Sequence, residues 1–298
     1  MNRVLVTKGQ GFFEEQEFPS HMVPKPDEIY VKSIMTGVCR SDIDMMCGTF
    51  GPLPVDMQGH EGLGQVISVG TSVQDVKSGE FVATRGEPAY ADYYIAKQFE
   101  YVKVPEADPK YIIEPVACAL NLIEQNELSI IDKQRTGADL LILGSGFLAY
   151  VVYHYLKLLK LKYNITVVGS SNSDLWGAVL QKDYTGTFDV VVDLSNRTDI
   201  FDKDILNNQA LVIFGSQKTV TTDFAKLLWK SATVTFPSPR SAVFHKCMKN
   251  AVTLIQNGHL NVDKFWTRAY NREHEWRQAF QDGLNRPANY SRGYIKWD

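Results

Sequence analysis

Hydrophobic residues in the first 110 positions occur in short runs separated by glycine, proline, aspartate and serine. The runs are EIYVKSIM, GQVISVG, EFVATR, YADYYIA and YVKVP. Short apolar runs between turn-forming residues are typical of β-strands. This part of the chain is therefore predicted to form an antiparallel barrel or sandwich, and it shows no repeat of fixed period.

A different pattern begins near residue 112. IIEPVACALNLIEQNEL has apolar residues at helical spacing, and beyond it apolar runs alternate with helical stretches. The runs are DLLIL, ITVVG, FDVVVDL, ALVIFG and ATVTF, with FLAYVVYHYLKLLK after the first. Continuous Val/Ile/Leu runs are typical of strands buried on both faces, and their alternation with helices indicates parallel βαβ units.

The pattern changes again after residue 240. SAVFHKCMKNAVTLIQNGHL has helical spacing and ends at Asn257-Gly258, and GYIKW can form a strand that returns to the first domain. We therefore expect an α/β-plus-β fold, in which an inserted α/β domain splits a β-rich domain. The expected boundaries are 1–115 with 246–298 for the β-rich domain, and 116–245 for the insertion.

Composition narrows the class of protein. The chain has 298 residues, 44% of them hydrophobic, and its formal charge of -3 gives no reason to expect nucleic acid as a partner. No apolar run approaches the roughly 18 residues of a membrane-spanning helix, and the first residues lack the pattern of a signal peptide. The four cysteines are sparse and unclustered, which favours reduced thiols and a cytoplasmic location.

A glycine-rich turn between a predicted strand and a predicted helix indicates dinucleotide binding. Its sequence is Gly144-Ser145-Gly146-Phe147-Leu148-Ala149. Gly144 permits the tight bend, Gly146 lets the backbone approach a pyrophosphate, and Ala149 allows close packing of helix and strand. Gly144, Gly146, Phe147 and Leu148 are therefore the candidate cofactor-binding residues. The alternative is a structural turn in a sheet that has lost its cofactor.

The end of the next predicted strand bears on which nucleotide is bound. Sites for NAD usually carry an acidic residue there, which bonds the ribose hydroxyls and would repel a 2′-phosphate. This chain has Ser170 and Ser171 instead, which leave room and hydroxyl donors for that phosphate. NADP is therefore favoured over NAD, although no Arg or Lys follows nearby in the sequence.

Cys39 and His60 offer a thiolate and an imidazole, both good zinc ligands. Their separation of 21 residues alone would more often reflect packing than ligation. The surrounding segments decide the interpretation: GVCRSD at 37–42, the segment 54–70 with Gly59-His60-Glu61 intact, and Ile113-Glu114-Pro115. Together they resemble the medium-chain, zinc-dependent alcohol and polyol dehydrogenases, in the branch of the sorbitol and threonine dehydrogenases.

The resemblance implies a GroES-like catalytic domain with an inserted Rossmann-type domain, one catalytic zinc, and hydride transfer between NAD(P)(H) and an alcohol, polyol or carbonyl substrate. It assigns roles by position: Cys39, His60 and Glu114 as zinc ligands, Glu61 as a carboxylate against the metal, Ser41 as proton relay, and Arg40 as a contact to cofactor phosphate. Structural alternatives exist for both acids. Glu61 can be a hydrogen-bonded acid in a turn, and Glu114 can stabilise a helix N-terminus.

The chain departs from the family in three places. No cysteine lies between Cys47 and Cys118, so the four-cysteine structural zinc lobe of many members is not expected. Asp44 stands where a histidine often continues the proton relay. Only 19 residues separate Val168 from Phe188, too few for two helices of about 11 residues and a strand of about 5. The third strand and a flanking helix are therefore expected to be missing or vestigial.

Two rival functions remain open. One is a zinc-independent quinone or enoyl reductase of the same fold, and the other is a non-catalytic nucleotide-binding or regulatory protein with an eroded cofactor domain. The sequence names no substrate: the expected pocket residues are Met45, Met46 and Phe50 with ranges 85–90 and 236–241, apolar or mixed in character. ATVTFPSP can supply the edge of a homodimer, as the resemblance implies.

Overall fold

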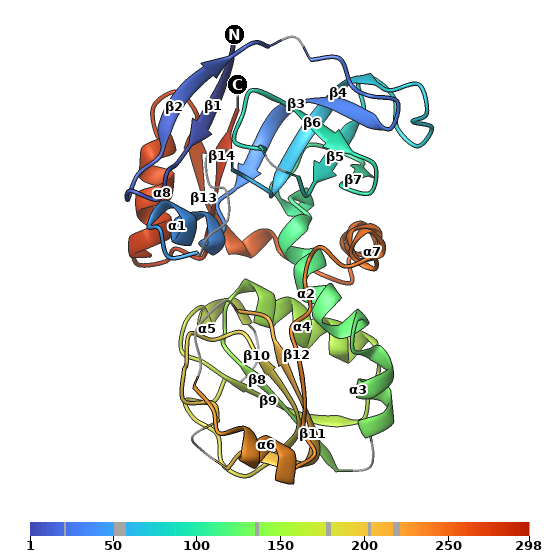
Figure 1. Cartoon of the computed structure of the whole chain (residues 1–298), viewed down its shortest axis with the longest axis vertical. Coiled ribbons are helices and arrows are strands. Elements are labelled where there is room, and N and C mark those ends of the chain that lie inside the picture. Colours follow the sequence, from blue (N-terminus) through green and yellow to red (C-terminus); the bar gives the residue numbers. More distant parts are fainter. Residues whose placement is uncertain are drawn as a thin grey trace. The chain divides into compact units, whose positions relative to one another are not determined.

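The computed structural model describes residues 1–20, 22–50, 58–86, 88–134, 137–176, 180–201, 204–216 and 221–297. The chain forms two compact units (Figure 1). Unit 1 consists of Met1–Pro115 and Met248–Asp298, and unit 2 of Val116–Cys247. Two helices carry the chain across the boundary, α2 (Glu114–Glu124) and α7 (Phe244–Gln256).

Unit 1 is built on a mostly antiparallel sheet of order β13-β14-β3-β4-β5-β7, with β6 paired to β3. Its strands are β3 (Glu28–Gly37), β4 (Gly62–Val69), β5 (Phe81–Thr84), β6 (Tyr93–Lys97), β7 (Tyr101–Val104), β13 (Trp266–Asn271) and β14 (Arg292–Lys296). Only the β13–β14 pairing is parallel among the described strands of this sheet. A two-stranded sheet of β1 (Asn2–Val6) and β2 (Glu14–Phe18) accompanies it, with helices α1 (Arg40–Met46) and α8 (Trp276–Asn285).

The core of unit 1 explains why these segments come together. One cluster joins Ile29 and Val31 of β3 to Val66 of β4 and Val82 of β5, all almost completely buried. A second cluster packs α1 against α8, and includes Ile43 and Phe280. The predicted returning strand, GYIKW, is β14, which pairs with β3 through Ile295 opposite Thr36.

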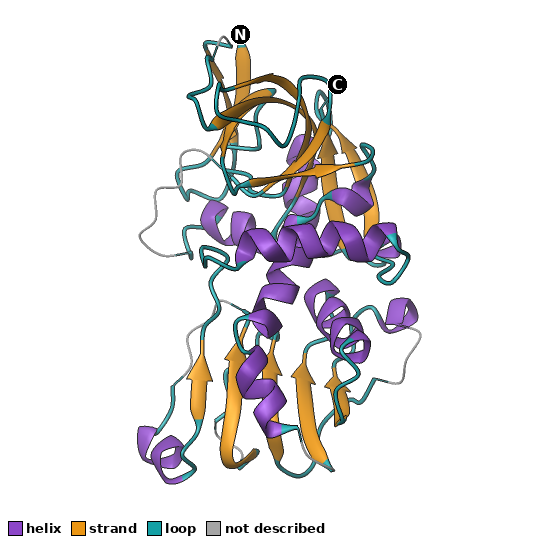
Figure 2. Cartoon of the chain, turned by 90° about the vertical axis from the view of Figure 1, so that its right-hand side faces the viewer, coloured by secondary structure: helices purple, strands orange, loops and turns teal. Residues whose placement is uncertain are grey.

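Unit 2 holds a parallel sheet of order β12-β11-β10-β8-β9, whose arrows point the same way in Figure 2. The strands are β8 (Ala138–Leu143), β9 (Tyr163–Val168), β10 (Phe188–Asp193), β11 (Leu206–Phe214) and β12 (Thr233–Thr235). The helices are α3 (Glu127–Lys133), α4 (Phe147–Leu158), α5 (Ser173–Trp176) and α6 (Phe224–Trp229). β10 is buried along its whole length, as its continuous apolar run predicts. The predicted combination of a β-rich domain and a parallel α/β domain is confirmed.

Beside β9, the described residues form no further strand of the unit 2 sheet. The described residues there contain one isolated parallel bridge, between Val168 and Gln181, in place of a further strand. Gln181 donates its N–H to the carbonyl of Val167 at 2.9 Å, and its own carbonyl accepts the N–H of Gly169 at 3.0 Å. The short passage between Val168 and Phe188 therefore leaves a vestige of a strand at this edge.

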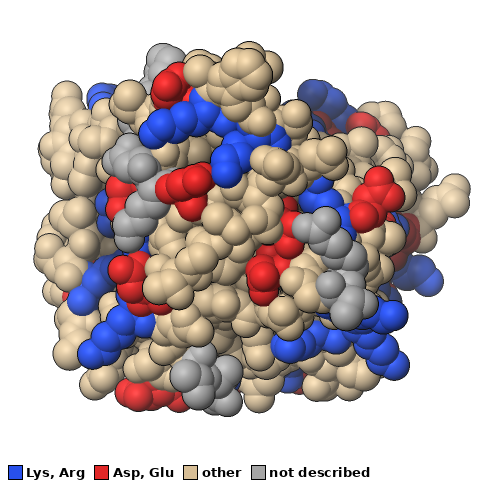
Figure 3. Space-filling view, turned by 90° about the horizontal axis from the view of Figure 1, so that it is seen from below, with Lys and Arg blue, Asp and Glu red and all other residues tan. Residues whose placement is uncertain are grey.

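No helix in the described part of the chain is long and apolar enough to cross a membrane. On the face shown in Figure 3, basic and acidic side chains are interspersed rather than segregated.

Candidate active site

Cys39, His60 and Glu61 form a cluster of metal-ligand type in unit 1. One ligand atom from each lies within 4.8 Å of the other two, and the described residues contain no second group of three or more His, Cys, Asp or Glu side chains arranged in this way. The pairing of β3 with β4 explains the meeting, because Thr36 lies opposite Gly62 and the N–H of Gly37 bonds the carbonyl of Glu61 at 3.0 Å. Residues just beyond the end of β3 and just before β4 are thereby brought together.

Asp42 orients the cluster from within the protein. It is fully buried, and its Oδ1 lies 3.3 Å from Nδ1 of His60. Its Oδ2 accepts the backbone N–H of Cys39 at 3.1 Å and the hydroxyl of Tyr90 at 2.9 Å. A carboxylate on one ring nitrogen fixes the orientation of a histidine and leaves the other nitrogen for a ligand. Sequence reasoning missed Asp42 and Tyr90; the available signal was an acid three residues after Cys39, at the start of a helix.

Electrostatics in the cluster favour a cationic ligand. Burial alone would lower the pKa of His60, but the Asp42 carboxylate and the Cys39 sulfur together outweigh it and raise that pKa well above its ordinary value. Burial raises the pKa of the Cys39 thiol, and the negative charge of Glu61 raises it further. A metal ion would reverse both effects, because it binds the deprotonated thiol and the neutral imidazole. The donor set of sulfur, nitrogen and oxygen is the one that zinc uses in proteins.

Ser41 places a hydroxyl against the cluster. Its Oγ donates to Sγ of Cys39 at 3.2 Å and lies 3.3 Å from Nε2 of His60. A hydroxyl can both donate and accept a proton, so it suits a relay at this position.

Glu61 is held by an arginine that sequence reasoning missed. Both carboxylate oxygens accept from Nη2 of Arg292 at 2.5 Å, and Glu61 is completely buried while the Arg292 side chain is 11% exposed. Burial alone would lower the pKa of Arg292, but Glu61, with smaller contributions from Cys39 and Tyr290, outweighs it and raises that pKa. The guanidinium also lies 4.9 Å from the ring centroid of Trp266. No sequence motif links positions 61 and 292, since β14 brings the arginine from the far end of the chain.

The carboxylate of Glu61 leaves space only for glycine at position 37. A Cβ built on Gly37 would lie 2.1 Å from Oε2 of Glu61. The Gly-Val-Cys segment thus contributes to the site in two ways: Gly37 leaves room for the Glu61 carboxylate, and Cys39 supplies the thiol.

Two residues assigned by resemblance lie elsewhere. Glu114 is the first residue of α2, is buried, and does not belong to the group of three ligand atoms. Arg40 begins α1 and pairs with Asp44, with Nε 2.9 Å from Oδ1. Asp44 therefore neutralises Arg40 at the position where the family often has a relay histidine.

The glycine-rich turn of unit 2 has the shape of a pyrophosphate cradle. Gly144 has a φ of +116°, and a Cβ there would lie 2.9 Å from the carbonyl oxygen of Leu194. Gly146 caps α4 without a side-chain hydrogen bond, and a Cβ there would meet no atom within 4 Å. The open space over Gly146 and the uncapped N–H groups of a 12-residue helix fit an anionic group. Phe147 and Leu148 are the first two residues of that helix, and Phe147 is buried.

The serines after β9 lie beside this turn. Oγ of Ser171 is 3.0 Å from Oγ of Ser145 within the glycine-rich segment, and Ser170 is exposed. A Cβ on Gly169 would come within 2.4 Å of Oγ of Ser145, so glycine is needed for the close approach.

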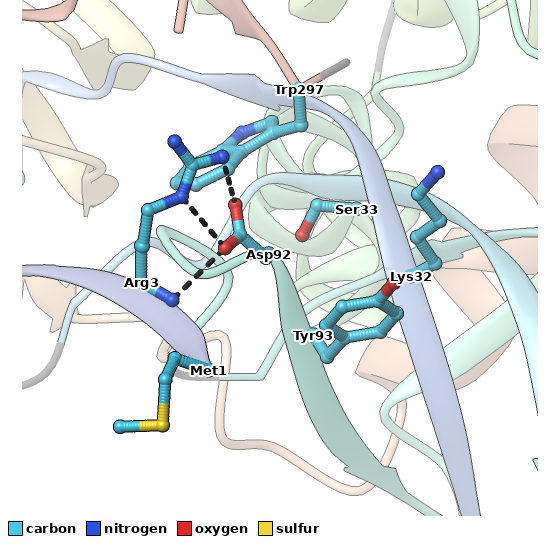
Figure 4. Close-up of a pocket in the computed structure, with 7 residues that line it drawn as sticks. All are labelled: Met1, Arg3, Lys32, Ser33, Asp92, Tyr93 and Trp297. Carbon is cyan, nitrogen blue, oxygen red and sulfur yellow. Dashed lines mark hydrogen bonds and ion pairs between the residues drawn. The ribbon is translucent and has the colours of Figure 1, made fainter. Parts of the chain in front are cut away.

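Two cavities of unit 1 lie apart from the three ligand residues. A groove of about 510 Å³ is lined mainly by the apolar residues Phe12, Phe13, Met46, Trp276 and Phe280. A polar pocket of about 270 Å³ is shown in Figure 4, where Arg3 bonds Asp92 beside Trp297 and Lys32 stands apart.

Of the expected substrate-pocket residues, Met45 and Met46 are buried, and Glu87 lies outside the described residues. The range 51–57 also lies outside the described residues, and it includes the first part of the motif segment 54–70.

Comparisons with known proteins agree with the fold. Residues 25–108 match the alcohol dehydrogenase GroES-like domain. The chain is 23% identical to D-arabinitol dehydrogenase 1 of Uromyces fabae over 324 aligned positions, which cover 88% of this chain and 87% of that protein.

Two solved structures share the fold across the chain. Zinc-dependent alcohol dehydrogenase 2 from Streptococcus pneumonia is 15% identical with a TM-score of 0.80, covering 100% of this chain and 99% of its own. A dehydrogenase of Sinorhizobium meliloti 1021, described as zinc-binding and bound to NADP, is 17% identical with a TM-score of 0.71, covering 99% of both chains. Residues 25–108 therefore form a domain of the alcohol dehydrogenase GroES-like type, and the chain as a whole shares the fold of the solved dehydrogenases that it matches.

Proposed function

We propose that this protein is a zinc-dependent, NAD(P)-linked oxidoreductase that exchanges a hydride with an alcohol, a polyol or the corresponding carbonyl. The observation that carries the proposal is the meeting of Cys39, His60 and Glu61, with their ligand atoms within 4.8 Å of one another. A D-arabinitol dehydrogenase among the relatives makes a polyol a natural first substrate to test.

Cys39 and His60 would hold the metal, with Glu61 as the third donor. When bound, zinc would act as a Lewis acid on the substrate oxygen, and the nicotinamide would exchange the hydride. Glu114 stays a candidate ligand on the strength of the family resemblance, and as the first residue of α2 it can equally stabilise that helix. A Glu114→Gln variant that retains its metal would assign it the helix role.

The chain's own residues then have distinct tasks. Asp42 holds Nδ1 of His60, so that Nε2 faces Ser41 and the cluster. Ser41 would take or return the proton of the substrate hydroxyl, since its Oγ already lies within hydrogen-bond range of two cluster atoms. Arg292 balances the charge of Glu61 in its buried position.

The cofactor would bind to unit 2. Gly144, Gly146, Phe147 and Leu148 would hold the pyrophosphate through backbone N–H groups at the start of α4. Ser170 and Ser171 take the place of the usual acidic residue, so NADP is favoured over NAD. Arg40 is the further candidate for a phosphate contact, and it would have to leave Asp44 to make one.

The test is a panel of alcohols, polyols and aldehydes with NADP(H) and NAD(H), run with and without a zinc chelator. We expect activity that the chelator and Cys39→Ala both abolish. Activity indifferent to both would support the zinc-independent reductase instead, whereas no binding of either cofactor by fluorescence titration would support the non-catalytic alternative. Cys47→Ala is the matched control, because Cys47 is exposed and lies outside the cluster.

We further propose a homodimer formed through β12 and a cytoplasmic location. β12 is an edge strand of the parallel sheet, and Trp229 and Phe236 beside it are 84% and 73% exposed. Light scattering of the wild type and of Val234→Pro tests the dimer, since a proline in the strand would remove an edge hydrogen bond. None of the four cysteines forms a disulfide, which favours a reducing compartment.

A further inference from the structure

The vestigial bridge beside β9 brings a lysine to the carboxyl edge of the parallel sheet. The bridge pairs Val168 with Gln181 in parallel. The residues that follow each partner, Gly169 and Lys182, therefore leave the sheet at the same edge and in the same direction. In the sequence Lys182 stands 11 residues after Ser171, so only the pairing brings the two segments together.

Lys182 differs from the nearby Arg197 in that it takes part in no ion pair among the described residues. Its side chain is exposed, and no hydrogen bond or ion pair engages it within the described residues. Arg197 is held by Asp199, with Nη2 and Oδ2 2.9 Å apart, and it also packs over the ring of Tyr184. Of the nearby cations that the structure describes, Lys182 can therefore turn to a ligand without breaking an ion pair.

The acid next to it is already engaged. Oδ1 of Asp183 accepts the N–H of Tyr184 at 2.9 Å and lies 3.8 Å from Nη1 of Arg197. Asp183 is thus bound to the segment that leads away from the bridge. It is less suited than a free acid to bond ribose hydroxyls, and its charge is partly balanced.

We propose that Lys182 binds the 2′-phosphate of NADP together with the hydroxyls of Ser170 and Ser171. The inference rests on the proposed function and deepens it, because it names the residue that would select between the two cofactors. Serine hydroxyls supply hydrogen bonds but no charge, and a phosphate is bound best where a cation accompanies them. Here the cation would come from Lys182, next to the bridge residue Gln181, rather than from the loop that follows β9.

The test measures binding and needs neither metal nor turnover. NADPH and NADH are titrated by nicotinamide fluorescence, and 2′,5′-ADP and 5′-AMP by calorimetry, which isolates the 2′-phosphate from the rest of the cofactor. The variants are Lys182→Gln, Lys182→Glu and the matched control Lys226→Gln. Lys226 is also exposed and belongs to unit 2, but it lies in α6, between the strands of the opposite edge.

We expect Lys182→Gln to raise the Kd for NADPH and 2′,5′-ADP about tenfold or more, as for loss of one charged hydrogen bond. Lys182→Glu should raise it further, while NADH, 5′-AMP and Lys226→Gln stay close to wild type. Three results would overturn the inference: equal effects on NADPH and NADH, equal effects of the Lys182 and Lys226 variants, or a preference of the wild type for NADH. Each of them would still be compatible with an NAD(P)-linked enzyme. Binding of neither dinucleotide would overturn the proposed function as well.

Discussion

The Arg292–Glu61 pair gives the sharpest prediction about stability. Replacement of Arg292 by methionine keeps much of the side-chain volume beside Trp266 but removes the charge. Glu61 has no exposed side-chain area, so its carboxylate would be left without its counter-ion inside the protein. Breaking a buried ion pair on one side typically costs about 3–5 kcal/mol, because the remaining charge is desolvated and unpaired.

An exposed ion pair of unit 1 provides the control. Nζ of Lys103 lies 2.6 Å from Oε1 of Glu80, a similar distance, but the two side chains are 54% and 28% exposed. Lys103→Met should therefore cost much less stability than Arg292→Met. The double variant Glu61→Gln with Arg292→Met should be more stable than Arg292→Met alone, since it removes the stranded charge.

The assay is urea unfolding of metal-free protein, followed by circular dichroism and tryptophan fluorescence and fitted with separate transitions where the two probes differ. Zinc should restore more stability to Arg292→Met than it adds to the wild type, because a bound cation compensates Glu61. If Arg292→Met unfolds at the same urea concentration as Lys103→Met, or if the double variant is the less stable, the reasoning about this pair is refuted.

Three other predictions concern single positions. Gly59→Ala should destabilise the fold by about 3 kcal/mol in urea unfolding, because φ is +91° and a Cβ would lie 2.5 Å from the backbone nitrogen of Tyr90; a loss below about 1 kcal/mol would contradict this. Gly146→Val should weaken NADPH binding about tenfold or more with little change in the unfolding midpoint, because its Cβ would enter open space at the start of α4; unchanged affinity would show that the pyrophosphate binds elsewhere. Iodoacetamide at pH 8 should alkylate exposed Cys47 before Cys247 in peptide mapping, because burial and then Glu124 raise the pKa of Cys247 to about 12; the reverse order would be a contradiction.

Local patterns predicted much of the fold for a physical reason. β10 is buried along its whole length and β11 from Ala210 onward, and the apolar runs at these positions carry a strong signal. β2 was not predicted, because its sequence EEQEF alternates between partly buried and exposed positions and has few apolar residues. Its pairing with β1 rests on backbone hydrogen bonds, which leave no trace in composition.

The site was predictable where it is encoded locally. Cys39 and His60 were found because their flanking residues form recognisable segments, and the β3–β4 register explains why the two meet. Arg292 could not be found in this way, because it reaches Glu61 from a strand 231 positions later in the chain. The position of Lys182 likewise depends on one bridge at Gln181, which a count of residues between strands does not reveal.

The zinc content of the purified protein shows whether Cys39 and His60 hold a metal ion. Plasma mass spectrometry is applied to the wild type, Cys39→Ala, His60→Ala and the control Cys47→Ala, with circular dichroism to verify that each is folded. We expect about one zinc per chain in the wild type and in Cys47→Ala, and a loss of most of it in the other two. Absence of zinc from the wild type after reconstitution, or undiminished zinc in folded Cys39→Ala and His60→Ala, would contradict this expectation.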